Sequence, residues 1–124
     1  DPAGVEYFNQ ENGDTVLFLV DQSTLTAEAT DLLNKQAEWL LNNPNKSITI
    51  EGHADETGTR EYNLALGARR AASVQNYLVS RGLTDSRINT VTFGKERPLA
   101  ICSDEACWSK NRRSVTLVAG GLGY

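Results

Sequence analysis

Residues 48–70 read ITIEGHADETGTREYNLALGARR, and this stretch decides the fold that the sequence predicts. Its first residues alternate isoleucine with polar residues, which predicts a half-buried strand over 47–53. A polar turn around Gly58 then leads into a helix predicted over about 59–80, and Gly82 is placed to cap its C-terminal end. A strand that runs into a long helix predicts a helix packed on a sheet.

Strands and helices continue to alternate on both sides of this stretch. The other predicted elements are a strand over 15–20, a helix over about 26–42, a strand over 88–93, a short helix over 104–110 and a last strand over 114–118. The first of them, TVLFLV, is a continuous apolar run, which is typical of a strand buried on both faces. The order β-α-β-α-β-α-β contains no repeat or linker. It predicts one domain over 14–119, with a lead-in tail at 1–13 and a disordered tail at 120–124.

Composition narrows the classes of function. The chain has 124 residues, of which 40% are hydrophobic and 23% charged, which fits one compact domain with a core. A net charge of -4 and no basic stripe argue against nucleic-acid binding and against electrostatic docking on anionic lipid. No apolar run approaches the ~20 residues that span a bilayer. No signal peptide is visible, so the chain is compatible with a cytosolic protein or with a mature secreted one.

The two cysteines, Cys102 and Cys107, lie in the sequence CSDEAC. Their spacing does not match the pattern of common zinc or redox motifs, and one histidine in the whole chain leaves a four-ligand zinc site short of donors. We expect a local disulfide, which would imply an oxidising compartment such as a periplasm. The alternative is two inert thiols in a reducing compartment.

A helical wheel over the predicted long helix separates its two arginines. Arg69 is predicted to face solvent, whereas Arg70 lies at the boundary of the core stripe, on one flank with Leu66 and Asn63. Asp55 lies in the turn before this helix. An aspartate and an arginine that face one pocket can hold the ammonium and the carboxylate of a zwitterionic ligand, with the leucine covering its aliphatic stem. Backbone N–H groups at the start of the helix offer a further contact to an anionic group.

A plainer interpretation of the same residues stays open. Asp55 or Thr57 can serve as a helix cap. Asp55 and Arg70 can also simply pair with each other, which contributes little to stability if the pair is exposed.

Three segments of the chain resemble the OmpA-like domain family. They are IEGHADETGTREYNLALGARRA at 50–71, INTVTFGKERP at 88–98 and KNRRSV at 110–115. They occur in the family's order and spacing, and the similarity spans about residues 16–118. Within the family the chain is most similar to the peptidoglycan-associated lipoproteins (Pal). The resemblance implies an α+β fold (an α/β sandwich of βαβαβ type), with a mixed four-stranded sheet and helices packed on one side.

The resemblance also implies a function and a place in the cell. Family members bind peptidoglycan non-covalently through the diaminopimelate of the stem peptide. The implied protein is not an enzyme and needs no cofactor. It tethers the outer membrane to the cell wall within the Tol-Pal system, which serves envelope integrity and cell division, and it has Tol proteins such as TolB as partners. It would lie on the periplasmic side of the outer membrane, held by an N-terminal lipid anchor that this chain does not contain. An alternative is a protein-interaction module of the cell envelope in which the Asp–Arg pair is structural.

The resemblance assigns the ligand contacts to particular residues. Asp55 and Arg70 match the two family residues that contact the amine and carboxylate ends of diaminopimelate. The complete predicted binding set is Asp55, Arg70, Asp21, Leu66, Val20, Thr57 and Asn63. Val20 stands where family members often carry phenylalanine, and Thr57 and Arg60 replace residues that are commonly arginine and proline. The CSDEAC loop is not general in the family either.

Other candidates for chemistry are weaker. His53 is the only histidine, and its place at a strand end favours a structural or pocket-lining role over that of a base or metal ligand. Glu51 and Glu56 form a conceivable glycosidase pair, but a strand-face charge and a solvated turn charge explain them better. No serine or cysteine has the partners of a nucleophile, so a peptidoglycan hydrolase lacks support. The basic cluster 110–113 predicts either a solvated edge with salt bridges or a docking site for an acidic partner or glycan.

Overall fold

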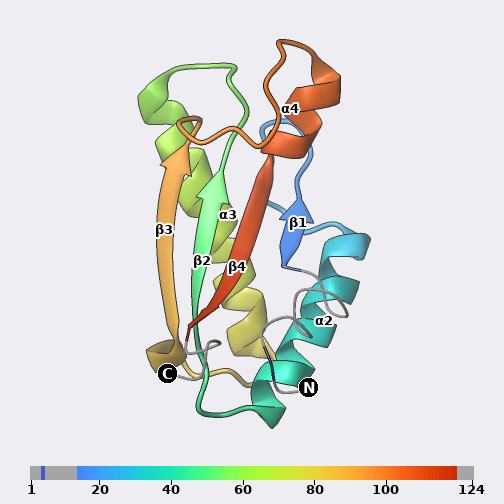
Figure 1. The fold of residues 1–124 in the computed structure, drawn as a ribbon, viewed down its shortest axis with the longest axis vertical. Helices are drawn as coiled ribbons and strands as arrows, with labels where there is room; N and C mark the ends of the chain where they lie inside the picture. Colours follow the sequence, from blue (N-terminus) through green and yellow to red (C-terminus); the bar gives the residue numbers. More distant parts are fainter. Residues whose placement is uncertain (1–3, 5–13, 120–124) are drawn as a thin grey trace.

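The computed structural model describes residue 4 and residues 14–119, and the predicted tails at 1–13 and 120–124 lie almost entirely outside them (Figure 1). The elements are β1 (Thr15–Leu17), α2 (Ala27–Asn42), β2 (Ser47–His53), α3 (Arg60–Ser80), the 3-10 turn η2 (Asp85–Arg87), β3 (Ile88–Gly94), α4 (Glu105–Asn111) and β4 (Arg113–Ala119).

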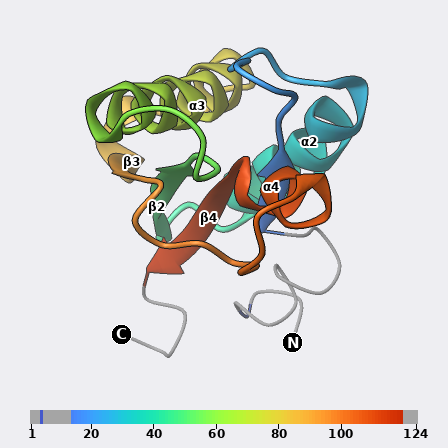
Figure 2. The same cartoon turned by 90° about the horizontal axis from the view of Figure 1, so that it is seen from above.

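The four strands form one mixed sheet in the order β1-β4-β2-β3. β2 and β3 are parallel, whereas β4 runs antiparallel to both β1 and β2. α2 and α3 cover the same face of this sheet, and α4 lies at its end beside the start of β4 (Figures 1 and 2). This arrangement confirms the predicted α+β class, with a mixed four-stranded sheet and its long helices on one side.

The core lies between the sheet and the two long helices. Ile48 and Ile50 of β2 are buried against it, as their alternation predicts. α3 approaches β2 unusually closely at two glycines. A Cβ added to Gly52 would lie 1.7 Å from the carbonyl oxygen of Gly67, so both positions need the absence of a side chain. This close approach fixes how deeply the middle of α3 sits against the end of β2.

The ends of α3 follow from its sequence. The Thr59 hydroxyl accepts the N–H of Tyr62 at 3.1 Å and caps the start of the helix. At the other end Gly82 has a φ of 112°, and the N–H of Leu83 donates to the carbonyl of Leu78 at 3.1 Å. This is the hydrogen-bond pattern of a Schellman cap, and it confirms the predicted role of Gly82.

The prediction for the first strand is wrong in two respects. β1 ends at Leu17 instead of residue 20, and it is an edge strand that pairs only with β4. Leu19 and Val20 are each 57% exposed, so the apolar run is not a strand buried on both faces. The chain turns away at Asp21, whose φ of 57° is left-handed and ends an extended strand. The continuous apolar run at 15–20 therefore forms a short, half-buried edge strand and leads into a turn.

Candidate functional site

The candidate site lies at the end of the sheet where β2 finishes and β4 begins (Figure 1). Asp55 lies two residues after the end of β2, Arg70 comes from the middle of α3, and Arg112 connects α4 to β4. Their exposed fractions are 7%, 0% and 4%. Charged side chains that are withdrawn from water need polar partners, and each of the three has them.

Asp55 is held by hydrogen bonds on both carboxylate oxygens. Oδ1 accepts the backbone N–H of Thr57 at 2.9 Å and also the Thr57 hydroxyl. Oδ2 accepts Nη1 of Arg112 at 3.2 Å. Burial by itself raises the pKa of Asp55, but the hydrogen bonds from Thr57 and Arg112 outweigh it and hold the pKa below its usual value. Asp55 is therefore ionised at neutral pH.

Arg70 is fixed by three backbone carbonyls. Its Nε donates to Gln22 at 2.9 Å, Nη1 to His53 at 2.9 Å and Nη2 to Leu19 at 3.2 Å. The guanidinium also lies 5.2 Å from the centre of the Phe18 ring. Burial lowers the pKa of Arg70 to about 10, which leaves it charged at neutral pH.

The helical-wheel prediction is wrong for the buried face of α3. Arg70 is on that face instead of at its boundary, and Leu66 and Asn63 are buried with it. A helical wheel of α3 also puts Ala68 in the apolar core stripe, but in the structure this residue is exposed. The wheel counts polar residues as solvent-facing, but here backbone carbonyls supply the acceptors that let an arginine and an asparagine be buried. The prediction for Arg69 is confirmed, since it is exposed on the helix surface.

The other residues of the predicted binding set lie around Asp55 and Arg70. Asn63 donates from Nδ2 to the carbonyl of Thr57 at 2.6 Å and so holds the turn that presents Asp55. Asp21 is exposed and accepts from the hydroxyl of Tyr62 at 3.4 Å. Val20 lies beside it in the same exposed turn. The structure thus brings Asp55, Thr57 and Asn63 together. Val20 and Asp21 lie in the turn whose neighbouring carbonyls, of Leu19 and Gln22, accept from Arg70.

Two residues that the sequence analysis did not assign to the site complete it. Arg112 donates to both carboxylate oxygens of Glu105, from Nη1 at 2.9 Å and from Nη2 at 2.7 Å, while Nη1 also contacts Asp55. Its Nε donates to the carbonyl of Phe18 at 3.1 Å. The pairing with Glu105 raises the pKa of Arg112 and lowers that of Glu105. The one available signal was their spacing of seven residues, which is two helical turns.

An apolar groove of about 550 Å³ borders Arg112 and Glu105. It runs between β1, the start of α2 and α4, and its walls include Val16, Phe18 and Leu32. Arg112 is thus a wall shared between this groove and the Asp55 site.

The basic cluster 110–113 is not a solvated edge. Asn111, Arg112 and Arg113 are all buried, and only Lys110 is exposed. Arg113 donates to the carbonyl of Arg97 at 3.0 Å. The salt-bridge part of the prediction holds for Arg112, whereas Arg113 is buried and Lys110 alone of the cluster is exposed to solvent.

His53 and the two glutamates have separate structural partners. His53 is buried, and its Nε2 lies 3.0 Å from Oε1 of Glu51. Burial lowers the pKa of His53 against the opposing effect of Glu51, so the ring is neutral at neutral pH. Glu56 instead accepts the indole N–H of Trp108 at 2.8 Å. Glu51 and Glu56 therefore do not face each other as an acid–base pair.

Cys102 and Cys107 are joined by a disulfide, with their Cα atoms 5.6 Å apart. The two sulfurs and the carboxylate of Asp104 lie within 4.8 Å of one another, the one such metal-sized group among the described residues. Because both thiols are consumed by the disulfide, this group does not offer two thiolate ligands to a metal.

No helix within residues 14–119 has the length and apolar character needed to cross a bilayer.

The sequence of this chain is similar to those of known proteins. The model of the OmpA family matches residues 17–112. The peptidoglycan-associated lipoprotein of Rhizobium meliloti is 53% identical over 119 residues, which cover 96% of this chain and 68% of that protein. That of Haemophilus influenzae is 42% identical over 106 residues, covering 86% of this chain and 69% of that protein.

Solved structures agree with the sequence comparison. The crystal structure of the peptidoglycan-associated lipoprotein from Burkholderia pseudomallei superposes with a TM-score of 0.88 at 36% identity, over 95% of this chain and 99% of that one. The C-terminal domain of Helicobacter pylori MotB superposes with a TM-score of 0.79 at 19% identity, over 89% of each chain, which is a likeness of fold alone.

Proposed function

Because this chain belongs to the OmpA family, we propose that it binds peptidoglycan non-covalently through the diaminopimelate residue of the stem peptide. It is a structural, peptidoglycan-associated protein and not an enzyme. In this proposal it tethers the outer membrane to the cell wall from the periplasmic side, as part of the Tol-Pal system. TolB would be a partner protein, and a lipid anchor on the full-length protein would hold it to the membrane.

The observation that carries the proposal is a buried, ionised carboxylate close to a buried, ionised guanidinium at one end of the sheet. The far end of diaminopimelate carries an ammonium and a carboxylate, so its charges complement this pair. Asp55 accepts three hydrogen bonds from Thr57 and Arg112. Since a carboxylate has about four acceptor sites, one remains for the ligand's ammonium.

Arg70 would meet the ligand's carboxylate. Its three hydrogen bonds to carbonyls use three of its five N–H groups. Two of those carbonyls, of Leu19 and Gln22, belong to the exposed turn at Asp21. In the bound state we expect this turn to shift, so that the ligand's carboxylate replaces one or both of them. Burial of the guanidinium strengthens its attraction for an anion, because little water screens it.

The alternative is an envelope protein-interaction module in which these residues are structural. Its specific support is that both charges already have partners within the chain, Asp55 in Arg112 and Arg70 in backbone carbonyls. The two hypotheses make opposite predictions for purified cell-wall sacculi, because only the first requires retention of the protein on them.

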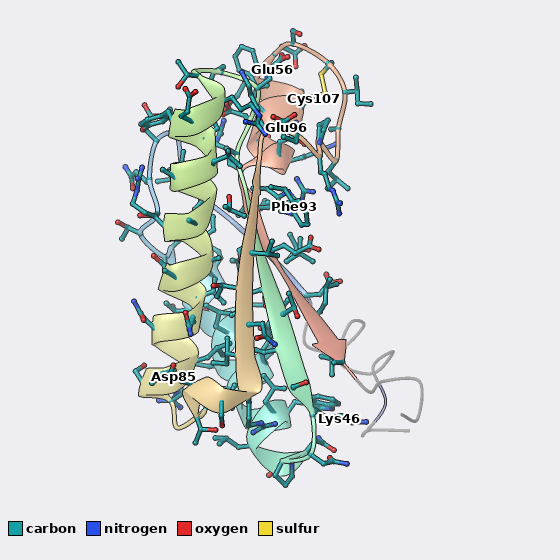
Figure 3. All side chains as sticks on the ribbon, turned by 90° about the vertical axis from the view of Figure 1, so that its left-hand side faces the viewer. Lys46, Glu56, Asp85, Phe93, Glu96 and Cys107 are labelled. Carbon is teal, nitrogen blue, oxygen red and sulfur yellow. A yellow bond between two sulfur atoms is a disulfide. The ribbon has the colours of Figure 1, made fainter. Side chains whose placement is uncertain are left out.

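Co-sedimentation of the protein with diaminopimelate-type sacculi tests the proposal. We expect wild type to sediment and Asp55→Asn to lose at least about tenfold in affinity, since a hydrogen bond to a charged group contributes about 1.5–3 kcal/mol. Asp85→Asn is the matched control, because Asp85 is exposed at the opposite end of the molecule (Figure 3). Absence of retention of folded wild type would refute the proposal and favour the interaction module.

A further inference from the structure

Glu105 is the outermost member of a chain of charges that ends at Asp55. It binds Arg112 through both carboxylate oxygens, at 2.9 and 2.7 Å, and Arg112 in turn reaches Asp55 at 3.2 Å. The Glu105 side chain is 62% exposed, whereas that of Arg112 is 5% exposed. An exposed carboxylate is thus bonded to a buried guanidinium that itself contacts Asp55 of the candidate site.

The position of Glu105 is fixed by the segment around it. The Cys102–Cys107 disulfide closes the loop that contains it. Asp104 caps α4 by accepting the N–H of Ala106 at 3.0 Å. Trp108, one helical turn further on, donates to Glu56 in the turn after β2 at 2.8 Å. Figure 3 shows Glu56 and Cys107 at the same end of the molecule. Glu105 is therefore presented from a braced helix and is not a loose surface side chain.

Glu105 balances the charge of Arg112 next to Asp55, and the exposed Asp21 adds a further negative charge that acts on Arg70. Asp55 and Glu105 are negative, and Arg70 and Arg112 are positive, so the four together are neutral. Without Glu105, Asp55 would be the one carboxylate bound to Arg112 among the described residues, and the three groups Asp55, Arg70 and Arg112 would carry a net positive charge. This change weakens the attraction of the site for the ligand's ammonium and strengthens its attraction for the ligand's carboxylate.

We propose that Glu105 is a positioning residue of the diaminopimelate site, which engages Arg112 so that Asp55 stays available to the ligand's ammonium. This inference rests on the proposed function, since it concerns the same ligand. It goes further in assigning to Glu105 the discrimination between side chains that carry an amine and side chains that carry only a carboxylate. If Glu105 only stabilised the fold, replacing it would weaken the binding of all ligands alike.

Three stem peptides that differ only at their third residue separate these roles. One carries diaminopimelate, one carries lysine, which has the amine without the carboxylate, and one carries 2-aminopimelate, which has the carboxylate without the amine. Their dissociation constants are measured by competition against a labelled diaminopimelate peptide. For Glu105→Gln we expect the lysine peptide to weaken by about threefold to fivefold, as for a partly exposed charge, and the 2-aminopimelate peptide to hold or tighten.

The ratio of the lysine to the 2-aminopimelate dissociation constant is the diagnostic quantity. It should rise by at least about threefold to fivefold in Glu105→Gln, and by more if the 2-aminopimelate peptide tightens. It should return towards wild type in Glu105→Asp and stay unchanged in Glu38→Gln, which removes an exposed charge on α2. An unchanged ratio in Glu105→Gln, with wild-type binding intact, would overturn the inference alone. If folded wild type binds none of the peptides, the proposed function fails and the inference fails with it.

Discussion

Replacing Arg70 with alanine removes the donors for three backbone carbonyls, two in the turn at Asp21 and one at the end of β2. The carbonyl of Leu19 keeps the N–H of Gln22 at 3.1 Å, but those of Gln22 and His53 lose the guanidinium that they bind at 2.9 Å. A hydrogen bond to a charged group contributes about 1.5–3 kcal/mol, so two such bonds suggest a loss of about 3–6 kcal/mol. The alanine no longer buries a charge, which offsets part of this, and we expect a net loss of about 3 kcal/mol.

Urea unfolding followed by circular dichroism measures this loss, with Arg69→Ala as a control at the neighbouring, exposed position. With a slope of about 1–3 kcal/mol per molar urea, the midpoint of Arg70→Ala should fall by at least about 1 M. Arg69→Ala should stay within about 0.5 kcal/mol of wild type. Equal midpoints for the two variants would refute the account of Arg70 as a buried hub. Ligand-binding measurements on Arg70→Ala are meaningful only after this comparison, and Arg70→Lys keeps the charge for that purpose.

Three further outcomes follow from the same contacts. Gly52→Ala should destabilise the fold by about 3 kcal/mol or prevent folding, because its Cβ would lie 1.7 Å from the oxygen of Gly67, and a thermal melt with wild-type stability would contradict this. The double variant Cys102→Ser/Cys107→Ser should lose about 2 kcal/mol of unfolding free energy, the loop-closure entropy of so short a loop, and a thiol assay that finds two free thiols in the unfolded, unreduced wild type would exclude the disulfide. The lowered pKa of Asp55 means that its stabilising contribution is complete above the pKa of the unfolded state and is lost as pH falls through the lower folded-state pKa. The urea midpoint of wild type should therefore fall as the pH is lowered from about 5 to about 2, and that of Asp55→Asn should fall less. An equal fall in the two proteins would contradict this prediction.

The elements that sequence predicted well are those whose local signals agree. β2 has alternating isoleucines, and α3 has a threonine cap at one end and a glycine cap at the other, so their bounds lie within one residue of the prediction. Asp55 could be singled out for a similar reason, because polar turns between a strand and a helix often carry binding residues.

The site's buried charges could not be predicted from local signals. Arg70 is buried because Gln22 and Leu19, about fifty residues earlier in the chain, turn their carbonyls toward it. No helical wheel contains those acceptors, so the wheel placed the arginine at a solvent boundary. The Arg112–Glu105 pair likewise depends on where α4 ends against the sheet, which the letters KNRRS do not reveal.

The sequence could not predict that β1 is an edge strand, for a different reason. Its apolar run reads the same whether both faces are covered or only one, and the strand order that decides between them comes from long-range pairing with β4. The turn at Asp21 then carries Leu19 and Val20 out to solvent beside the candidate site.

The central claim is that this domain recognises both ends of the diaminopimelate side chain. Isothermal titration of wild type with a stem peptide that carries diaminopimelate, beside the same peptide with lysine, tests it most directly. We predict binding of the diaminopimelate peptide, a loss of at least about tenfold with the lysine peptide, and a comparable loss when Asp55→Asn meets diaminopimelate. Equal affinity for the two peptides, or undiminished affinity in folded Asp55→Asn, would contradict the claim.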